Sequence, residues 1–209
     1  MYFVKTPRWL KRIYGNYVWH IPPKGKDLYL TFDDGPHPVA TPFVLDELKK
    51  HQAKATFFCL GKNVLEFPDV YRRITDEGHA VGNHTHNHLN GWKTEVANYI
   101  GNVKMAANHI NSKLFRPPYG RIKKQQGTEI KKLGFEIVMW DVLSGDFDVT
   151  LQPSQCLENI TRKARAGSIV VFHDSEKAFN NLKFALPGIL DCFSANGYRF
   201  KAISGSSIK

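Results

Sequence analysis

The chain has 209 residues, of which 42% are hydrophobic and 23% charged, as in an ordinary globular protein. Its 29 lysines and arginines outnumber its 19 aspartates and glutamates, so the formal net charge is +10. This composition excludes a low-complexity chain, and the positive charge favours an anionic partner such as nucleic acid, an acidic membrane or an acidic wall polymer. The sequence shows no helix-turn-helix, zinc-finger or RNA-binding signature, so we expect no nucleic-acid partner.

The N-terminal segment does not resemble a signal peptide. Lys5, Arg8, Lys11 and Arg12 interrupt any apolar run there, and no stretch of the chain is apolar enough to span a bilayer. The sequence leaves the location of the protein open; as written, it fits one that is cytoplasmic or peripheral to the inner membrane. Residues 1–20 mix these bases with aromatic side chains. This mixture indicates a segment that packs on the main domain or, as the less common alternative, one that contacts an anionic membrane or wall surface.

Seven strand-like runs alternate with helix-like stretches along the chain. The strands are predicted at residues 28–32, 55–60, 79–81, 113–116, 136–140, 168–172 and 198–203. Helices are predicted between them at residues 41–50, 65–77, 94–111, 123–133, 155–166 and 182–195. Such alternation predicts a parallel sheet or a β/α barrel. No linker divides the pattern, so we expect one domain over residues 1–209, with a core near 27–203 and an N-terminal extension, 1–26, packed on the barrel.

Polar clusters follow five of the predicted strands, at the points where the strands end. These clusters are Asp33-Asp34, His84 to His88, Arg116 to Gly120, Asp146, and His173-Asp174. In a β/α barrel the carboxyl ends of the strands share one face, and catalytic groups gather there. We therefore expect residues that are far apart in the sequence to form one active site on that face.

The first cluster lies in the run Thr31-Phe32-Asp33-Asp34-Gly35-Pro36. Side chains alternate in direction along an extended chain, so the two carboxylates should point differently. One carboxylate can then bind a cation while its neighbour handles a proton. Aspartate and glycine are also common in plain turns, so this run alone leaves both interpretations open.

The second cluster contains three histidines in five residues, and His84 and His88 are four residues apart. On a helical turn this spacing places both imidazoles on one face, where they can share a metal, while His86 should point elsewhere. Together with one aspartate, the pair makes a site that keeps positions open for water and substrate. Zn²⁺ is the default metal for such ligands, and Co²⁺, Ni²⁺, Fe²⁺ and Mn²⁺ also suit them.

The remaining clusters supply an arginine, an aspartate and a histidine. Arg116 precedes two prolines that stiffen its loop, and it can pair with and orient a nearby carboxylate, although a rigid turn with a surface arginine would look the same. His173 ends an apolar strand and is either a functional group or a buried structural histidine.

In this order, the five segments resemble the polysaccharide deacetylases of carbohydrate esterase family 4, over about residues 27–203. That family includes chitin, chitooligosaccharide, peptidoglycan N-acetylglucosamine and xylan deacetylases. The combination of Thr-Phe-Asp-Asp-Gly-Pro with His-Thr-x-x-His is highly specific. The resemblance implies a distorted (β/α) barrel, often with seven strands. It also implies a metal-dependent hydrolase that removes N-acetyl groups from N-acetylglucosamine-containing glycans of the chitooligosaccharide or peptidoglycan type.

The resemblance further implies a role for the residues of the first three segments. Asp34, His84 and His88 would be the metal ligands. Asp33 would be the general base that takes a proton from the metal-activated water, and Arg116 would pair with it.

The later segments would complete the catalytic groups by the same resemblance. The backbone N–H of Tyr119 would help bind the oxyanion, and His173 would be the general acid, oriented by Asp146. The fourth segment departs from the family pattern of Asp-x-x-Asp-Trp, because Leu143 replaces the first aspartate and Phe147 replaces the tryptophan. Phenylalanine is still a large apolar wall but lacks the indole N–H, which bears on substrate preference.

Three alternatives stay open at this point. The same scaffold could serve an O-acetyl esterase of the xylan type or an amidase for small molecules. A non-catalytic glycan-binding protein would fit the net charge and the aromatic N-terminal segment. The residue set favours an enzyme, because a binding protein has no need for both carboxylates, the histidines and the arginine together.

Overall fold

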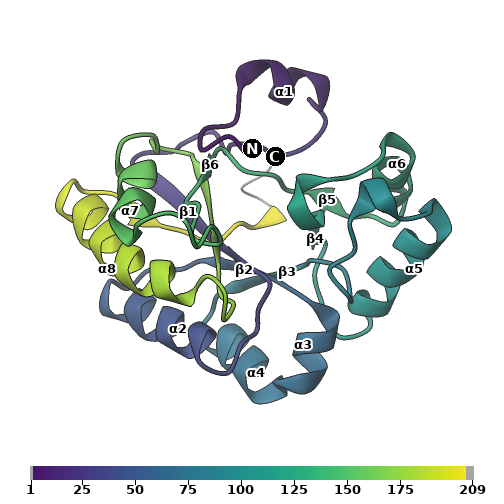
Figure 1. Cartoon of the computed structure of the whole chain (residues 1–209), viewed down its shortest axis with the longest axis horizontal. Helices are drawn as coiled ribbons and strands as arrows, with labels where there is room; N and C mark the ends of the chain where they lie inside the picture. Colours follow the sequence, from purple (N-terminus) through teal and green to yellow (C-terminus); the bar gives the residue numbers. More distant parts are fainter. Residues whose placement is uncertain (1, 206–209) are drawn as a thin grey trace.

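The computed structural model describes residues 2–205, which form a curled parallel sheet with helices around it (Figure 1). The strands are β1 (Asp27–Asp33), β2 (Thr56–Cys59), β3 (Ala80–Asn83), β4 (Leu114–Phe115), β5 (Glu136–Ile137), β6 (Val142–Leu143), β7 (Ile169–His173) and β8 (Arg199–Phe200). Seven of them are hydrogen-bonded in the order β5-β4-β3-β2-β1-β7-β6, and β8 pairs separately with β1. The predicted seven-stranded, distorted β/α barrel is confirmed.

Helices cover the outside of the sheet (Figure 1). They are α1 (Arg8–Ile13), α2 (Ala40–Lys50), α3 (Gly61–Glu66), α4 (Pro68–Asp76), α5 (Val96–Ala107), α6 (Lys124–Lys132), α7 (Pro153–Thr161) and α8 (Phe179–Ala195), with short 3-10 helices η1 (Gly91–Lys93) and η2 (Pro118–Gly120). α2, α7 and α8 lie along one side, and α5 and α6 lie at the other end of the sheet. No helix within residues 2–205 is long and apolar enough to cross a membrane.

Strand β1 is buried along its whole length and divides its side chains between two environments. Leu30 and Phe32 join the main hydrophobic core, which also contains residues of α2 and α8. Thr31 and Asp33 alternate with them and point to the other face, where both contact Arg116. The period-two alternation of a strand thus places an apolar row against the helices and a polar row inside the barrel.

The N-terminal segment runs along the opening between β5 and β6, the two ends of the curled sheet. Val18 forms a parallel bridge with Val138, just after β5, and Lys5 forms an antiparallel bridge with Val142 in β6. Tyr17 and Trp19 are buried in a cluster with residues of α5 and α6. Backbone groups that would stay unpaired at these sheet edges therefore find partners in the N-terminal segment.

Two predicted elements are divided in the structure. The strand expected at 136–140 ends at Ile137, and β6 was missed, because the apolar run pairs first with β4 and then with β7 at opposite edges of the sheet. The helix expected at 65–77 is really α3 and α4. Pro68 separates them, since a proline lacks the N–H needed inside a helix but fits the first position of α4.

Candidate metal and catalytic site

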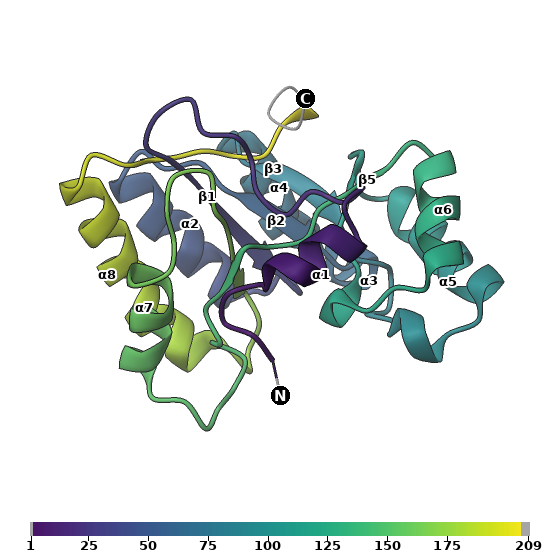
Figure 2. The ribbon, with the colours of Figure 1, turned by 90° about the horizontal axis from the view of Figure 1, so that it is seen from above.

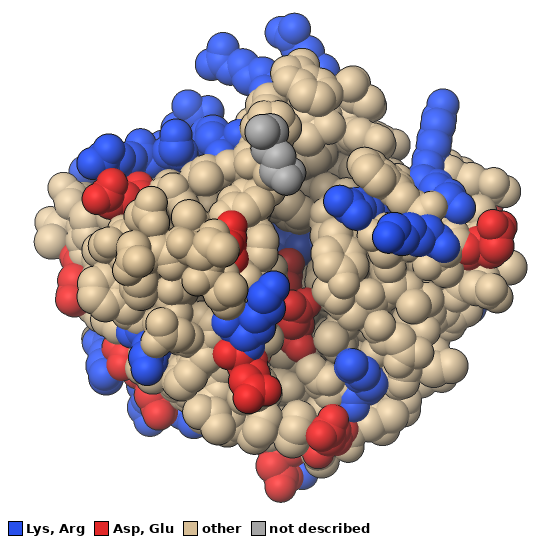
Figure 3. All heavy atoms as spheres, viewed as in Figure 1, with Lys and Arg blue, Asp and Glu red and all other residues tan. Residues whose placement is uncertain are grey.

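The predicted site residues meet at the carboxyl ends of the strands. The β1–β7 register pairs Asp33 with His173, and the β3–β4 register pairs Asn83 with Phe115, which immediately precedes Arg116. The space-filling view shows acidic atoms in a hollow near the centre of the molecule (Figure 3). Because these strands run parallel and their ends are in register, segments separated by more than a hundred residues meet on one face.

Asp34, His84 and His88 form a cluster whose ligand atoms all lie within 4.8 Å of one another. Asp34 Oδ1 is 3.0 Å from His88 Nε2 and 3.5 Å from His84 Nε2. This oxygen is buried and has no hydrogen-bond partner within residues 2–205. A buried carboxylate oxygen that faces two imidazole nitrogens without a hydrogen bond fits a cation between the three groups.

The second ring nitrogen of His84 strengthens this interpretation. His84 Nδ1 lies 2.8 Å from the backbone oxygen of Arg116. Because a carbonyl oxygen only accepts, Nδ1 carries the proton, and the lone pair of Nε2 is free for a metal. The two-histidine, one-carboxylate set matches the donors of catalytic zinc sites.

The loop that carries the histidines is not the helical turn expected from their spacing. Residues 84–88 form no helix, and both Thr85 and His88 have positive φ angles, of 66° and 57°. Two asparagines hold this loop. The Asn83 side chain accepts a hydrogen bond from the Thr85 N–H, and Asn102 Oδ1 accepts from the N–H groups of residues 86 and 87. The rings of His84 and His88 come together, at 5.2 Å, through backbone that side-chain amides stabilise.

His86 points away from the cluster, as predicted. Its ring lies 6.3 Å from that of His109, and its Nδ1 approaches Gly61 of α3. Within the described chain, the metal-ligand geometry thus involves only the first and last histidines of the motif.

Asp33 is oriented by an arginine that is completely buried. Arg116 Nη1 donates to Asp33 Oδ1 at 2.7 Å and to Thr31 Oγ1 at 2.6 Å. Its Nε and Nη2 donate to the backbone oxygens of Val138 and Met139. These four hydrogen bonds fix the guanidinium, which in turn anchors Oδ1 of the Asp33 carboxylate.

Asp34 lies next in sequence but points to the histidines rather than to Arg116. Its φ of 80° departs from the extended conformation of β1. This turn separates the two neighbouring carboxylates, as the alternation argument predicted, although a left-handed residue rather than simple strand alternation produces the divergence.

His173 and Asp146 form a close pair beside these groups. Asp146 accepts the backbone N–H of His173 at 2.7 Å and lies 2.8 Å from its ring Nδ1. Burial lowers the pKa of His173, but the charge and hydrogen bond of Asp146, helped by Asp34 and Asp33, outweigh it and raise the pKa to about 9. The imidazole is therefore protonated at neutral pH and has a proton to donate.

Aromatic rings line the rim of the site. The ring of Tyr119, a residue with a φ of 60°, lies 4.5 Å from that of His88. On the other side, the ring of Phe147 lies 5.1 Å from that of His173. Tyr2 supports Phe147 from behind, with its ring at 5.1 Å. The N-terminal segment therefore supports, through Tyr2, the aromatic wall of the site near His173.

Asp174 has a structural role that its position in the sequence did not reveal. It is buried, accepts the Gly35 N–H at 3.1 Å and accepts the Thr41 hydroxyl. Burial raises the pKa of Asp174 to about 8, so the group is largely neutral at pH 7. A Cβ on Gly35 would come within 2.1 Å of Asp174, so only glycine fits this turn after Asp34. In the sequence, only the position of Asp174 directly after His173 pointed to this role.

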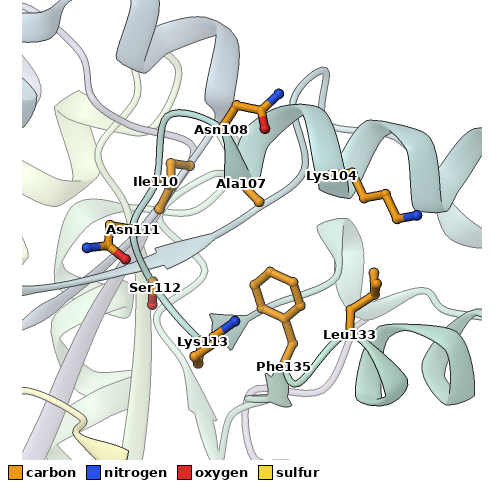
Figure 4. A pocket seen from close by; sticks show the side chains of 9 residues that line it. All are labelled: Lys104, Ala107, Asn108, Ile110, Asn111, Ser112, Lys113, Leu133 and Phe135. Carbon is orange, nitrogen blue, oxygen red and sulfur yellow. The ribbon is translucent and has the colours of Figure 1, made fainter.

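A separate pocket lies away from this site. Its volume is about 410 Å³, and it is lined by residues of α5, the loop that follows α5 and the turn between α6 and β5, among them Lys104, Lys113 and Phe135 (Figure 4). None of the predicted site residues lines it. The candidate metal and catalytic site and this pocket therefore share no residues.

Known proteins are similar to this chain over most of its length. The polysaccharide deacetylase family model matches residues 20–138. A peptidoglycan-N-acetylglucosamine deacetylase of Bacillus cereus is 34% identical over 202 residues, which cover 91% of this chain and 92% of that protein. A chitooligosaccharide deacetylase of Azorhizobium caulinodans is 37% identical over 154 residues, which cover 70% of this chain and 73% of that protein.

A solved structure is similar to the whole fold. The crystal structure of a peptidoglycan N-acetylglucosamine deacetylase in complex with an N-oxidanyl-benzamide superposes with a TM-score of 0.85 at 31% identity. The superposition covers 95% of this chain and 96% of that one. The motif order, the barrel and these similarities agree, and the chain belongs to the polysaccharide deacetylases, the metal-dependent hydrolases of carbohydrate esterase family 4.

Proposed function

We propose that this protein removes the N-acetyl group from N-acetylglucosamine units of a glycan, with peptidoglycan strands or chitooligosaccharides as the substrate class. The observation that carries the proposal is the convergence of the Asp34, His84 and His88 ligand atoms within 4.8 Å, directly beside the Asp33–Arg116 and His173–Asp146 pairs. This arrangement combines one cation site with two separate proton-handling groups.

The metal site is proposed to hold Zn²⁺ through Asp34, His84 and His88. Co²⁺, Ni²⁺, Fe²⁺ and Mn²⁺ suit the same donors. When bound, such an ion supplies Lewis acidity, which polarises the acetamide carbonyl and lowers the pKa of water. Three protein ligands would leave coordination positions for water and for the carbonyl oxygen, as in catalytic zinc sites.

Asp33 acts as the general base in this proposal. Arg116 anchors Oδ1 of this carboxylate, so that Oδ2 can take a proton from the water as it attacks the carbonyl carbon. The Tyr119 N–H helps to bind the oxyanion that develops on the former carbonyl oxygen. The ring contact between Tyr119 and His88 supports this position of the backbone beside the cation.

His173 completes the reaction as the general acid. Its pKa, raised to about 9, keeps a proton available near neutral pH, and Asp146 holds the ring. The proton passes to the nitrogen of the departing amino sugar as the carbon–nitrogen bond breaks, and acetate is the other product. The proton taken by Asp33 and the proton given by His173 balance the hydrolysis.

Two alternatives use the same groups. O-deacetylation of a xylan-type ester needs the same water and oxyanion groups but a less basic leaving group, and a small-molecule amidase needs no extended groove. The buried carboxylate–arginine pair and the raised pKa of His173 disfavour a non-catalytic glycan-binding protein, since binding alone requires neither.

The test is acetate release from N-acetylglucosamine oligomers and from peptidoglycan by metal-stripped protein, with and without added Zn²⁺. We expect release only with metal, and loss of turnover in Asp33→Asn. Release from acetylated xylan or small amides, with none from the sugar amides, would replace the substrate assignment. Absence of turnover on every substrate, despite tight metal binding, would refute the enzymatic proposal.

A further inference from the structure

The first residues of the chain carry a large share of its exposed apolar surface. Phe3, Trp9 and Ile13 are 53%, 57% and 66% exposed, and they are three of the ten large hydrophobic side chains exposed within residues 2–205. Scattered apolar side chains on a surface need no explanation. Three within residues 3–13 make this segment a candidate contact surface.

The short helix α1 contributes none of its residues to the buried core. Trp9 and Ile13 are four residues apart and therefore share one side of the helix. Arg8 and Arg12 have the same spacing, are exposed, and form no ion pair within the described chain. An apolar pair and a cationic pair thus lie next to each other on the outside of α1.

The segment is nevertheless held firmly on the barrel. Lys5 and Lys11 turn inward and form ion pairs with the buried Asp141, which also accepts a hydrogen bond from Ser168. The Thr6 N–H donates to the backbone oxygen of Asp141 at 2.9 Å. The inward lysines therefore fix α1 in place, so that its outer residues form a preorganised surface rather than a loose tail.

The views place this surface beside the catalytic face. α1 lies at the upper edge of the molecule in Figure 1, and it faces the viewer when the molecule is seen from above in Figure 2. The hollow with acidic atoms opens toward the viewer in Figure 3, and lysines and arginines project at the upper edge. Contact through α1 would leave the hollow open along the side of the molecule.

We propose that α1 and Phe3 dock the protein on the surface of an anionic lipid bilayer. Trp9, Ile13 and Phe3 would enter the interface between headgroups and acyl chains, a region that suits tryptophan, while Arg8 and Arg12 would meet anionic headgroups. The contact is peripheral, because no described helix is long enough to cross a membrane.

A bilayer fits this surface better than the other anionic or apolar partners. A polyanionic wall polymer would satisfy the two arginines but would leave the apolar side chains in water. A stable protein interface buries about 800 Å² on each partner, which exceeds what one six-residue helix offers. The formal net charge of +10 adds long-range attraction to an anionic membrane.

The experiment measures sedimentation of the full chain with vesicles of phosphatidylcholine plus phosphatidylglycerol, and with vesicles of phosphatidylcholine alone. We expect binding to the anionic vesicles that weakens with salt. Removing the charges in Arg8→Gln and Arg12→Gln should weaken binding about fivefold for each arginine. The double variant Trp9→Ala, Ile13→Ala should weaken it at least as much, while activity on a soluble substrate stays at the wild-type level.

Matched controls remove similar groups elsewhere. Phe184→Ala removes an apolar side chain that is 53% exposed on α8, and the pair Lys104→Gln, Lys124→Gln removes two exposed charges from α5 and α6. The proposal would be overturned if the wild-type protein did not bind anionic vesicles. It would also be overturned if the control variants lost as much binding as the α1 variants.

Two other outcomes would assign a different occupant. Dependence on the arginines but not on Trp9 and Ile13 would point to a polyanion instead of a bilayer. A shift from dimer to monomer in Trp9→Ala, Ile13→Ala would identify a second copy of this chain. Either result would overturn bilayer docking without affecting the proposed deacetylation.

Discussion

Asp146 accepts the backbone N–H of His173 at 2.7 Å and lies 2.8 Å from the Nδ1 of the same residue. The Ser144 hydroxyl donates to this carboxylate at 2.8 Å, so Asp146 is itself held in place. One buried carboxylate thus controls both the orientation of the imidazole and the pKa that makes it a proton donor.

Replacing Asp146 with asparagine should lower the pKa of His173 from about 9, because burial then acts without the opposing negative charge. In the proposed mechanism the protonated form of His173 is the reactive one. This form is lost as pH rises through the pKa of His173, so the basic limb of the pH–rate profile should move to lower pH. We expect kcat at neutral pH to fall about 100-fold or more. Profiles of kcat for wild type and variant test this, with Asp76→Asn, an exposed aspartate on α4, as control. An unmoved basic limb would contradict the role of His173.

Replacing His84 with alanine should abolish tight metal binding, since it removes one of the three proposed ligands. His86→Ala is the matched control, because His86 has the same chemistry two residues away but points toward His109. Zinc content after equilibrium dialysis measures the difference. We expect His84→Ala to lose far more affinity than the about 10- to 100-fold typical of outer-shell changes, and His86→Ala to keep its zinc. The reverse result would show that the ligand set is wrong.

Replacing Asn102 with alanine should weaken metal binding without removing any ligand. Its Oδ1 accepts two backbone N–H groups of the histidine loop, at 2.8 and 2.9 Å, and that loop contains positive-φ residues. We expect zinc affinity to fall about 10- to 100-fold. Asn98→Ala, an exposed position on the same helix, should leave affinity unchanged. Equal affinities for the two variants would contradict a positioning role for Asn102.

Replacing Tyr2 with alanine should change substrate binding more than the chemical step. Its ring supports Phe147, and its hydroxyl donates to Asp148 at 3.0 Å. Without the ring of Tyr2, Phe147 can move away from His173. The energy of such an aromatic contact corresponds to a KM that is about three- to tenfold higher. Tyr2→Phe keeps the ring and should stay close to wild type. Separate measurements of KM and kcat for the three proteins test this prediction. A wild-type KM in Tyr2→Ala would show that the contact between Tyr2 and Phe147 does not affect substrate binding.

Replacing Asp141 with asparagine should lower the free energy of unfolding by about 2 kcal/mol at neutral pH, because charge-assisted hydrogen bonds to two lysines are lost. Burial raises the pKa of Asp141, but Lys11, Lys5 and Ser168 outweigh it and lower the pKa from 3.8 to about 2. A depressed carboxyl pKa stabilises the fold above the unfolded value and loses this effect as pH falls toward 2. Urea unfolding of both proteins should therefore show a difference in the free energy of unfolding that becomes smaller as the pH falls. A difference that does not change with pH would show that the charge of Asp141 is not its cause.

The positions of the site residues were readable from the sequence because they follow strands. Asp33, Arg116 and His173 each come directly at or after the end of an apolar run, and parallel strands end on one face. The three proposed metal ligands could be named because the motifs that contain them resemble those of the family. Their convergence required only that the strands pair in parallel.

Other parts of the site depend on contacts between distant segments. Asn102 on α5 and Tyr2 near the N-terminus carry no local signal, since their roles exist only where α5 meets the histidine loop and where the N-terminal segment meets Phe147. The spacing of His84 and His88 suggested a helical turn, yet a loop with left-handed residues brings the rings together. Four-residue spacing is compatible with both conformations, and only the side-chain amides around the loop decide between them.

The sequence by itself determined the strand–helix alternation and the polar residues at the strand ends, because hydrophobic periodicity and strand ends are local properties of the chain. It indicated the barrel, rather than an open parallel sheet, through the resemblance of its motifs. The tertiary structure decided how β5 and β6 separate, how the N-terminal segment lies across the opening between them, and which bases turn inward to Asp141. These features depend on which distant groups remain unpaired after the sheet has formed, and no local pattern records that.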